Sequence, residues 1–189
     1  MAAGTITATA SGLKLLLGTT STNDTSVESI RSHVLAADKV WTAIARISLE
    51  DVDTDGFFFG FCTDGTVEVI SAEPADGIWF ESGVADATLI GTVVGESGTS
   101  ADTGTLATLT DGTMVEVGVQ FAVNTDVAKC WGNWWVDGTV TAFTAAQLTQ
   151  LDAMITTTPP TLSCLIGGRA GDTGADDVFV QYAWGGVDR

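Results

Sequence analysis

Positive charge is scarce in this sequence. Its 189 residues hold seven Lys and Arg against 24 Asp and Glu, which gives a formal net charge of −17. A nucleic-acid surface needs clustered cations to displace counterions from phosphates, so we expect no nucleic-acid partner. The single histidine, His33, is also a weak basis for catalysis, because a lone histidine is more often structural than catalytic.

Long hydrophobic runs and paired cysteines are missing as well. No stretch approaches the roughly 18 apolar residues of a membrane span, so we expect no membrane partner. The LKLLLG stretch near the N-terminus is too short for the core of a secretory signal. Cys62, Cys130 and Cys164 have no C-x-x-C spacing and lie among apolar residues, which predicts buried thiols and synthesis in a reducing cytoplasm.

Short segments of apolar–polar alternation dominate what is present. The clearest covers 115–121, where Val, Val, Val and Phe alternate with Glu, Gly and Gln. Asp-Gly dipeptides and other turn signals separate such segments, which predicts an all-β sandwich of two sheets. Thr144 and Gln147 have the spacing of a capping box, so one short helix is expected near 144–156. We expect one sandwich domain over 38–189, preceded by an N-terminal arm or edge segment over 1–37.

The sharpest local motif is the Asp-rich corner DVDTDG at 51–56. Asp51, Asp53 and Asp55 copy the alternate carboxylates at the start of a calcium loop, and the following glycine permits the sharp turn. The pattern then fails, because Cys62 stands where a bidentate glutamate is needed. The three aspartates are therefore candidate calcium ligands, with a purely structural corner as the alternative. No other cofactor is indicated.

Six tryptophans form the second notable set. They are Trp41, Trp79, Trp131, Trp134, Trp135 and Trp184. Aromatic residues on a β-sandwich can belong to the core or to an interface, and exposed ones can form a stacking platform for sugar rings. Trp134 and Trp135 are adjacent, so on a strand they must point to opposite faces, and we consider this pair a candidate partner-binding site.

Catalytic constellations are not found. Glycoside hydrolysis needs two positioned carboxylates, whereas Glu68, Glu81 and Glu116 each stand alone on their segments. The sequence has no nucleophile-elbow motif and no phosphate-binding glycine loop followed by Lys-Ser/Thr. From these absences we predict no catalytic residues and a protein that is not an enzyme.

Three segments together resemble a known family. They are VWTAIARISLEDVDTDGFFFGFCTDGT (40–66), DGIWFES (76–82) and GTMVEVGVQFAVNTDVAKCWGNWWVDGTV (112–140), and VFVQYAWGGVDR (178–189) resembles a closing strand. They are similar to concanavalin-like jelly-roll proteins found among the virion structural proteins of tailed bacteriophages. The resemblance implies a lectin-like jelly roll, and most of all a capsid decoration or cement protein. Such a protein would be a homotrimer on the capsid exterior of the virion, synthesised in the host cytoplasm, with the major capsid protein as partner. The alternative function is a carbohydrate-binding jelly-roll module on a tail fibre or spike.

Overall fold

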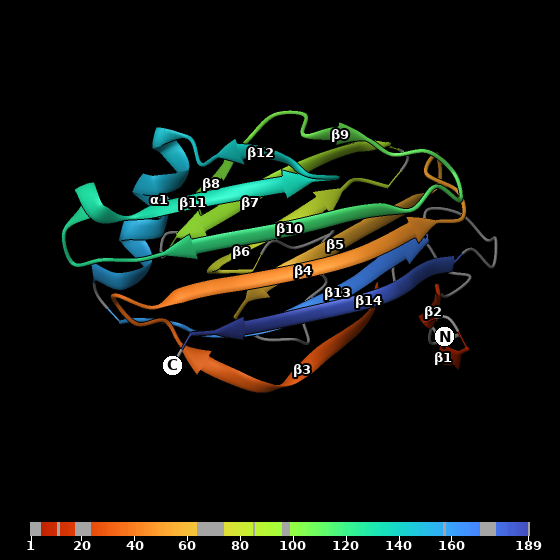
Figure 1. The fold of residues 1–189 in the computed structure, drawn as a ribbon, viewed down its shortest axis with the longest axis horizontal. Coiled ribbons are helices and arrows are strands. Elements are labelled where there is room, and N and C mark those ends of the chain that lie inside the picture. The colour runs from red at the N-terminus through yellow and green to blue at the C-terminus, as the bar shows by residue number, and fades with distance from the viewer. Residues whose placement is uncertain are drawn as a thin grey trace.

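Two antiparallel β-sheets packed face to face form the protein, with one helix at one end (Figure 1). The computed structural model describes residues 5–10, 12–17, 24–63, 74–84, 86–95, 99–156, 158–170 and 177–188. This arrangement confirms the predicted all-β sandwich with one helix. None of the helices in the part of the chain the structure describes is long and apolar enough to span a bilayer.

Sheet A faces the viewer in Figure 1 and contains seven strands. Their spatial order is β1 (Thr5–Thr9), β2 (Gly12–Leu16), β14 (Asp177–Val187), β4 (Val40–Leu49), β10 (Val115–Ala122), β11 (Trp131–Val136) and β12 (Thr139–Ala142). Every neighbouring pair is antiparallel, so paired residues in adjacent strands present their side chains on the same face.

Sheet B lies behind sheet A. Its strands are ordered β3 (Asp24–Val34), β13 (Thr161–Ala170), β5 (Asp55–Cys62), β6 (Gly77–Ser82), β7 (Thr88–Gly95) and β8 (Thr99–Asp102), and β9 (Ala107–Thr108) pairs with β7. A short 3₁₀ turn, η1 (Val127–Lys129), precedes β11. All eight residues of β5 are buried, because each face of this strand contacts its own apolar cluster.

Aromatic side chains fill the space between the sheets. Trp41 stacks on Phe121 with ring centroids 5.9 Å apart, and Phe61 meets Trp41 edge-on at 5.3 Å. Trp134 likewise stacks on Phe143 at 4.8 Å. Stacked and edge-on pairs of this kind contribute about 0.5–1.5 kcal/mol beyond simple burial. The core therefore fixes one face of sheet A inward and leaves the other toward solvent.

The helix α1 (Ala145–Thr156) begins with the predicted capping box. The backbone N–H of Gln147 donates to Thr144 Oγ1 at 3.2 Å, and the N–H of Thr144 donates to Gln147 Oε1 at 3.0 Å. The amide of Gln147 also donates to the carbonyl oxygens of Gly91 at 2.8 Å and Ala101 at 3.3 Å. One fully buried side chain thus caps the helix and fastens it to β7 and β8.

Within residues 1–37 the described strands lie at sheet edges. β1 and β2 form one edge of sheet A, and β3 forms one edge of sheet B. Leu15 and Leu17 are nevertheless fully buried, so the segment around them contributes to the core and is more than an arm. Residues 1–4, 11 and 18–23 of the predicted N-terminal segment lie outside the described residues. The boundary at residue 37 stays a prediction.

Candidate functional site

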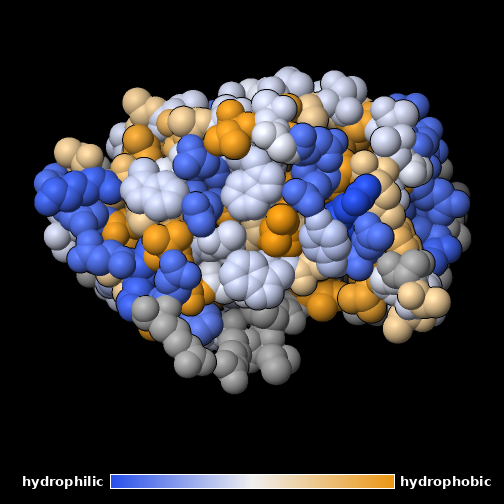
Figure 2. Space-filling model, viewed as in Figure 1, coloured by the Kyte–Doolittle hydropathy of each residue, from blue (hydrophilic) through white to orange (hydrophobic). Residues whose placement is uncertain are grey.

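The solvent side of sheet A gathers aromatic and hydrogen-bonding side chains. Strand alternation directs every second residue of the central strands outward, because their inward neighbours form the core. We call this surface the A face and define it by Thr42, Ile44, Arg46, Glu116, Gln120, Trp131, Asn133, Trp135, Tyr182 and Trp184. Figure 2 looks onto it and shows pale, ring-shaped side chains among blue hydrophilic ones.

A β-bulge places two of these aromatic residues on the A face. Val180 pairs with Ile47, an inward residue, while Tyr182 pairs with the outward Arg46, so the register shifts by one residue at Gln181. Without this shift, Tyr182 and Trp184 would continue the inward alternation of Val180. With it, Tyr182 is 40% exposed and Trp184 is 56% exposed.

Trp135 and Trp184 lie over glycines. A Cβ atom on Gly118 would come within 2.0 Å of the Trp135 ring, and one on Gly186 would come within 2.9 Å of the Trp184 ring. Each indole therefore packs directly against the backbone, because the glycine beneath it has no side chain. One cross-strand row runs from Trp184 through Ile44 and Gly118 to Trp135. The backbone positions of the two tryptophans are separated by three interstrand spacings, or about 14 Å.

Tyr182, Arg46 and Glu116 form the adjacent row across β14, β4 and β10. The Tyr182 hydroxyl donates a hydrogen bond to Glu116 Oε2 across the intervening strand. This bond, together with the negative charge of Glu116, raises the pKa of Tyr182 above the ordinary phenol value, while Arg46 opposes the shift. Tyr182 is therefore protonated at neutral pH, and its hydroxyl serves as a hydrogen-bond donor to Glu116.

A third row carries neutral polar groups. The amide of Gln120 donates to Thr42 Oγ1 at 3.1 Å, and Asn133 is the cross-strand partner of Gln120 on β11. All three side chains are half-buried, so their remaining donors and acceptors face solvent at the sheet surface. Trp131, 37% exposed, lies two residues further along β11, about 13 Å from Trp135.

One end of sheet A holds a hollow of about 280 Å³. Lys14, Ser48, Glu50, Asp177 and Phe179 are among its lining residues. Lys14 forms an ion pair with Asp177, which is buried, and this pairing raises the pKa of Lys14. The positive charge at this end is therefore already neutralised within the protein.

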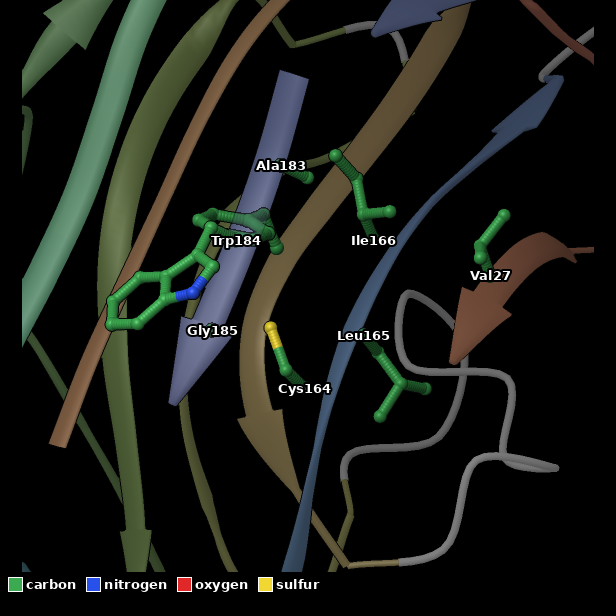
Figure 3. A pocket seen from close by; sticks show the side chains of 8 residues that line it. Val27, Cys164, Leu165, Ile166, Ala183, Trp184 and Gly185 are labelled. Carbon is green, nitrogen blue, oxygen red and sulfur yellow. The ribbon is translucent and has the colours of Figure 1, made fainter. Parts of the chain in front are cut away.

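A second pocket, of about 150 Å³, lies between the sheets beside β14 (Figure 3). Val27, Ile166 and Ala183 line it together with Cys164, and the indole of Trp184 points away from the thiol. Burial raises the pKa of Cys164 to about 12, so this thiol stays protonated at neutral pH and is not a nucleophile. The pocket has an apolar lining and no group suited to chemistry.

The Asp-rich corner between β4 and β5 does not form a ligand set. Asp51 Oδ1 accepts the N–H of Asp53 at 2.9 Å, Asp53 is exposed, and Asp55 is fully buried at the start of β5. Among the described residues, no group of three or more His, Cys, Asp or Glu side chains could hold a metal ion. The geometry gives the calcium prediction no support, and it stays a prediction.

The adjacent tryptophans point to opposite faces, as strand alternation requires. Trp134 is fully buried between the sheets, where its indole N–H donates to Gln147 Oε1 at 3.4 Å. A partner cannot reach it, so the prediction that Trp134 contacts a partner is wrong. Trp135 is half-buried on the A face, and a binding role for it stays a prediction.

Several A-face residues were not predicted as site residues. Arg46, Glu116 and Gln120 alternate with apolar neighbours, so their outward direction could have been inferred from the pattern. Their rows with Tyr182 and Asn133 could not have been inferred, because no local signal in the sequence shows which distant strands pair. Tyr182 and Trp184 also depend on the bulge at Gln181.

Solved structures share this fold, although no protein-family model and no curated protein matches the chain. An endo-β-1,4-glucuronan lyase from the fungus Trichoderma reesei has a TM-score of 0.68 at 16% identity, over 97% of this chain and 87% of that one. A carbohydrate-binding module from Bacillus subtilis has a TM-score of 0.53 at 13% identity, over 96% and 91%. Peanut lectin has a TM-score of 0.59 at 11% identity, over 98% and 89%.

These similarities establish the fold, which is a concanavalin-like jelly-roll sandwich, as predicted. At such identities they do not establish what this chain binds. The similar proteins include lectins, a carbohydrate-binding module, lyases and a glucanase, and these similarities do not show the phage origin and decoration role that the sequence resemblance implied.

The prediction that the chain is not an enzyme is overturned. Two kinds of alginate lyase and an endo-1,3-β-glucanase join the glucuronan lyase among the similar structures. The prediction rested on missing motifs, and the jelly roll is a fold on which glycan-cleaving enzymes are built. Residues from three distant strands, such as Tyr182, Arg46 and Glu116, can meet in one row without leaving a motif in the sequence.

Proposed function

We propose that this protein binds carbohydrate on the A face. The observation that carries the proposal is the pair of indoles on Gly118 and Gly186, which present ring surfaces on a solvent-facing sheet. The C–H groups of a sugar ring pack favourably on the electron-rich face of an aromatic ring. Lectins and a carbohydrate-binding module among the similar structures support this function over capsid decoration.

The spacing of the aromatic residues favours an extended glycan over a single sugar. The backbone positions of Trp184 and Trp135 are about 14 Å apart across the sheet, with the Trp135 ring one strand nearer over Gly118, and those of Trp131 and Trp135 are about 13 Å apart along β11. Each distance exceeds the width of one sugar ring. Gln120, Thr42 and Asn133 lie between the aromatic residues and supply hydrogen-bonding groups for sugar hydroxyls.

Replacing the exposed tryptophans with alanine tests this proposal. We expect Trp135→Ala and Trp184→Ala each to weaken glycan binding about tenfold or more, because each removes one stacking surface. Binding is measured by screening a glycan array with the wild-type protein and then titrating the strongest ligand by calorimetry.

Val34→Ala is the matched control, since Val34 is an apolar side chain 60% exposed on β3 of sheet B, away from the A face, and carries no ring. It should leave the affinity unchanged. A wild-type protein that binds no glycan, or tryptophan variants that bind as well as wild type, would contradict the proposal.

Glycan cleavage at the same face is a second candidate, and the Tyr182 row is the observation that favours it. A phenol held protonated by Glu116 could donate a proton to the glycosidic oxygen as its C–O bond breaks, while a water molecule adds to the sugar carbon and releases its proton to solvent. Tyr182 is the only tyrosine, so ultraviolet titration reports its pKa directly. We expect a midpoint above the usual value near 10, and a lower midpoint in Glu116→Gln.

The same chemistry would make cleavage depend on the phenol. If the protein shortens a bound glycan, Tyr182→Phe should abolish the appearance of new chain ends and leave binding in place. Equal cleavage by Tyr182→Phe and wild type would exclude Tyr182 as the proton donor.

A location on a phage virion is a separate hypothesis that rests on the sequence resemblance. The hypothesis places the protein on the capsid exterior, as a homotrimer with the major capsid protein as its partner. All three statements stay predictions. Mass spectrometry of purified virions would test it, since decoration requires hundreds of copies per particle. A fibre or spike would carry few copies and would agree with glycan binding.

A further inference from the structure

We infer that the A face selects uncharged glycans and that Glu116 is the residue that excludes acidic ones. The inference rests on the proposed carbohydrate-binding function and specifies its ligand class. It separates this chain from the similar structures that are named as alginate or glucuronan lyases. The balance of charges on and around the A face carries the inference.

Two cations lie on the described strands of sheet A, and each has a carboxylate as an ion-pair or cross-strand partner. Lys14 is ion-paired with Asp177, and Glu50 adds a further negative charge near the same lysine. Arg46 is the direct cross-strand partner of Glu116. Arg46 and Glu116 thus contribute no net charge to their row, and the charge of Lys14 is balanced by Asp177.

Glu116 occupies the position at which an acidic sugar would meet Arg46. Its carboxylate accepts the Tyr182 hydroxyl across β4, so it is held over the row that contains Arg46. A uronate carboxylate placed there would lie beside a like charge, and like charges at contact distance oppose binding strongly. A neutral sugar hydroxyl can instead donate to Glu116 and accept from Arg46.

The charge of the whole molecule and the uncharged polar groups of the A face also favour neutral glycans over acidic ones. The net charge of −17 repels polyanions, although salt screens this repulsion beyond about 8–10 Å. The remaining polar groups at the centre of the face are the amides of Gln120 and Asn133 and the hydroxyl of Thr42, which are uncharged. Amides and hydroxyls match sugar hydroxyls without requiring a charged ligand.

A matched pair of ligands tests the inference on the full chain. The wild-type protein is first screened against neutral β-glucan, mannan and galactan, whose sugars carry primary hydroxyls, and against alginate and polyglucuronate. The neutral glycan that binds best is then compared with the same glycan after its primary hydroxyls have been oxidised to carboxylates. We expect the oxidised form to bind about tenfold more weakly or worse.

The variant Glu116→Gln should reduce this preference about fivefold or more, because it leaves the charge of Arg46 available. Asp53→Asn is the matched control, since it removes the same charge from an exposed corner residue outside the A face and should keep the wild-type ratio. A preference for the oxidised glycan, or a ratio that Glu116→Gln leaves unchanged, would overturn the inference alone. Failure of every glycan to bind would overturn the proposed function itself.

Discussion

Replacing Gln147 with leucine should lower the free energy of unfolding by about 3–5 kcal/mol. The side chain is fully buried and makes four hydrogen bonds, to Thr144, Trp134, Gly91 and Ala101. Leucine has nearly the same volume, so the loss comes from the hydrogen bonds and not from a cavity. Each buried donor or acceptor left without a partner costs about 1–3 kcal/mol.

Urea denaturation followed by tryptophan fluorescence measures this loss as a shift of the midpoint at constant slope. The control is Thr149→Ala on the same helix, where an exposed hydroxyl bonds only to the carbonyl of Ala145 and a change of about 0.5 kcal/mol or less is expected. A Gln147→Leu midpoint equal to that of the control would show that the buried bonds contribute nothing net.

The variant Gln147→Glu should make the free energy of unfolding depend on pH. The carboxylate would face the carbonyl oxygens of Gly91 and Ala101, so burial and these acceptors would raise its pKa in the folded state. A group whose pKa is raised on folding destabilises the protein above its unfolded pKa, near 4.3 for glutamate. The stability deficit of Gln147→Glu relative to wild type should therefore grow as the pH rises from about 4 to 7.

Gln147 also illustrates how far sequence reasoning reaches. The spacing of Thr144 and Gln147 predicts a helix start because a capping box is a local structure, and the structure confirms it. The bonds from Gln147 to Gly91 and Trp134 join residues 56 and 13 positions away. No local pattern encodes such contacts, so the role of Gln147 in linking the helix to both sheets could not be predicted.

The A face likewise combines features that the sequence predicts with features that depend on strand pairing. Alternation predicts that Trp134 and Trp135 separate, but which one enters the core depends on the partner sheet. Alternation applied to β14 gives the wrong answer, because it places Tyr182 inward with Val180, and the bulge at Gln181 reverses this. The sequence therefore predicts the sandwich and its strands, whereas the site depends on register, which is a property of strand pairing.

The position of Trp135 depends on Gly118 having no side chain, and Gly118→Ala should weaken glycan binding about as much as Trp135→Ala, roughly tenfold or more. One added methyl group would lie 2.0 Å from the indole, so the ring must leave its place on β10. Gly83→Ala is the control, because a Cβ there meets its nearest neighbour at an ordinary 3.5 Å. A double-mutant cycle is decisive, since Gly118→Ala should have little further effect once Trp135 is alanine. Additive losses would mean that Gly118 acts on the glycan by a route other than the tryptophan.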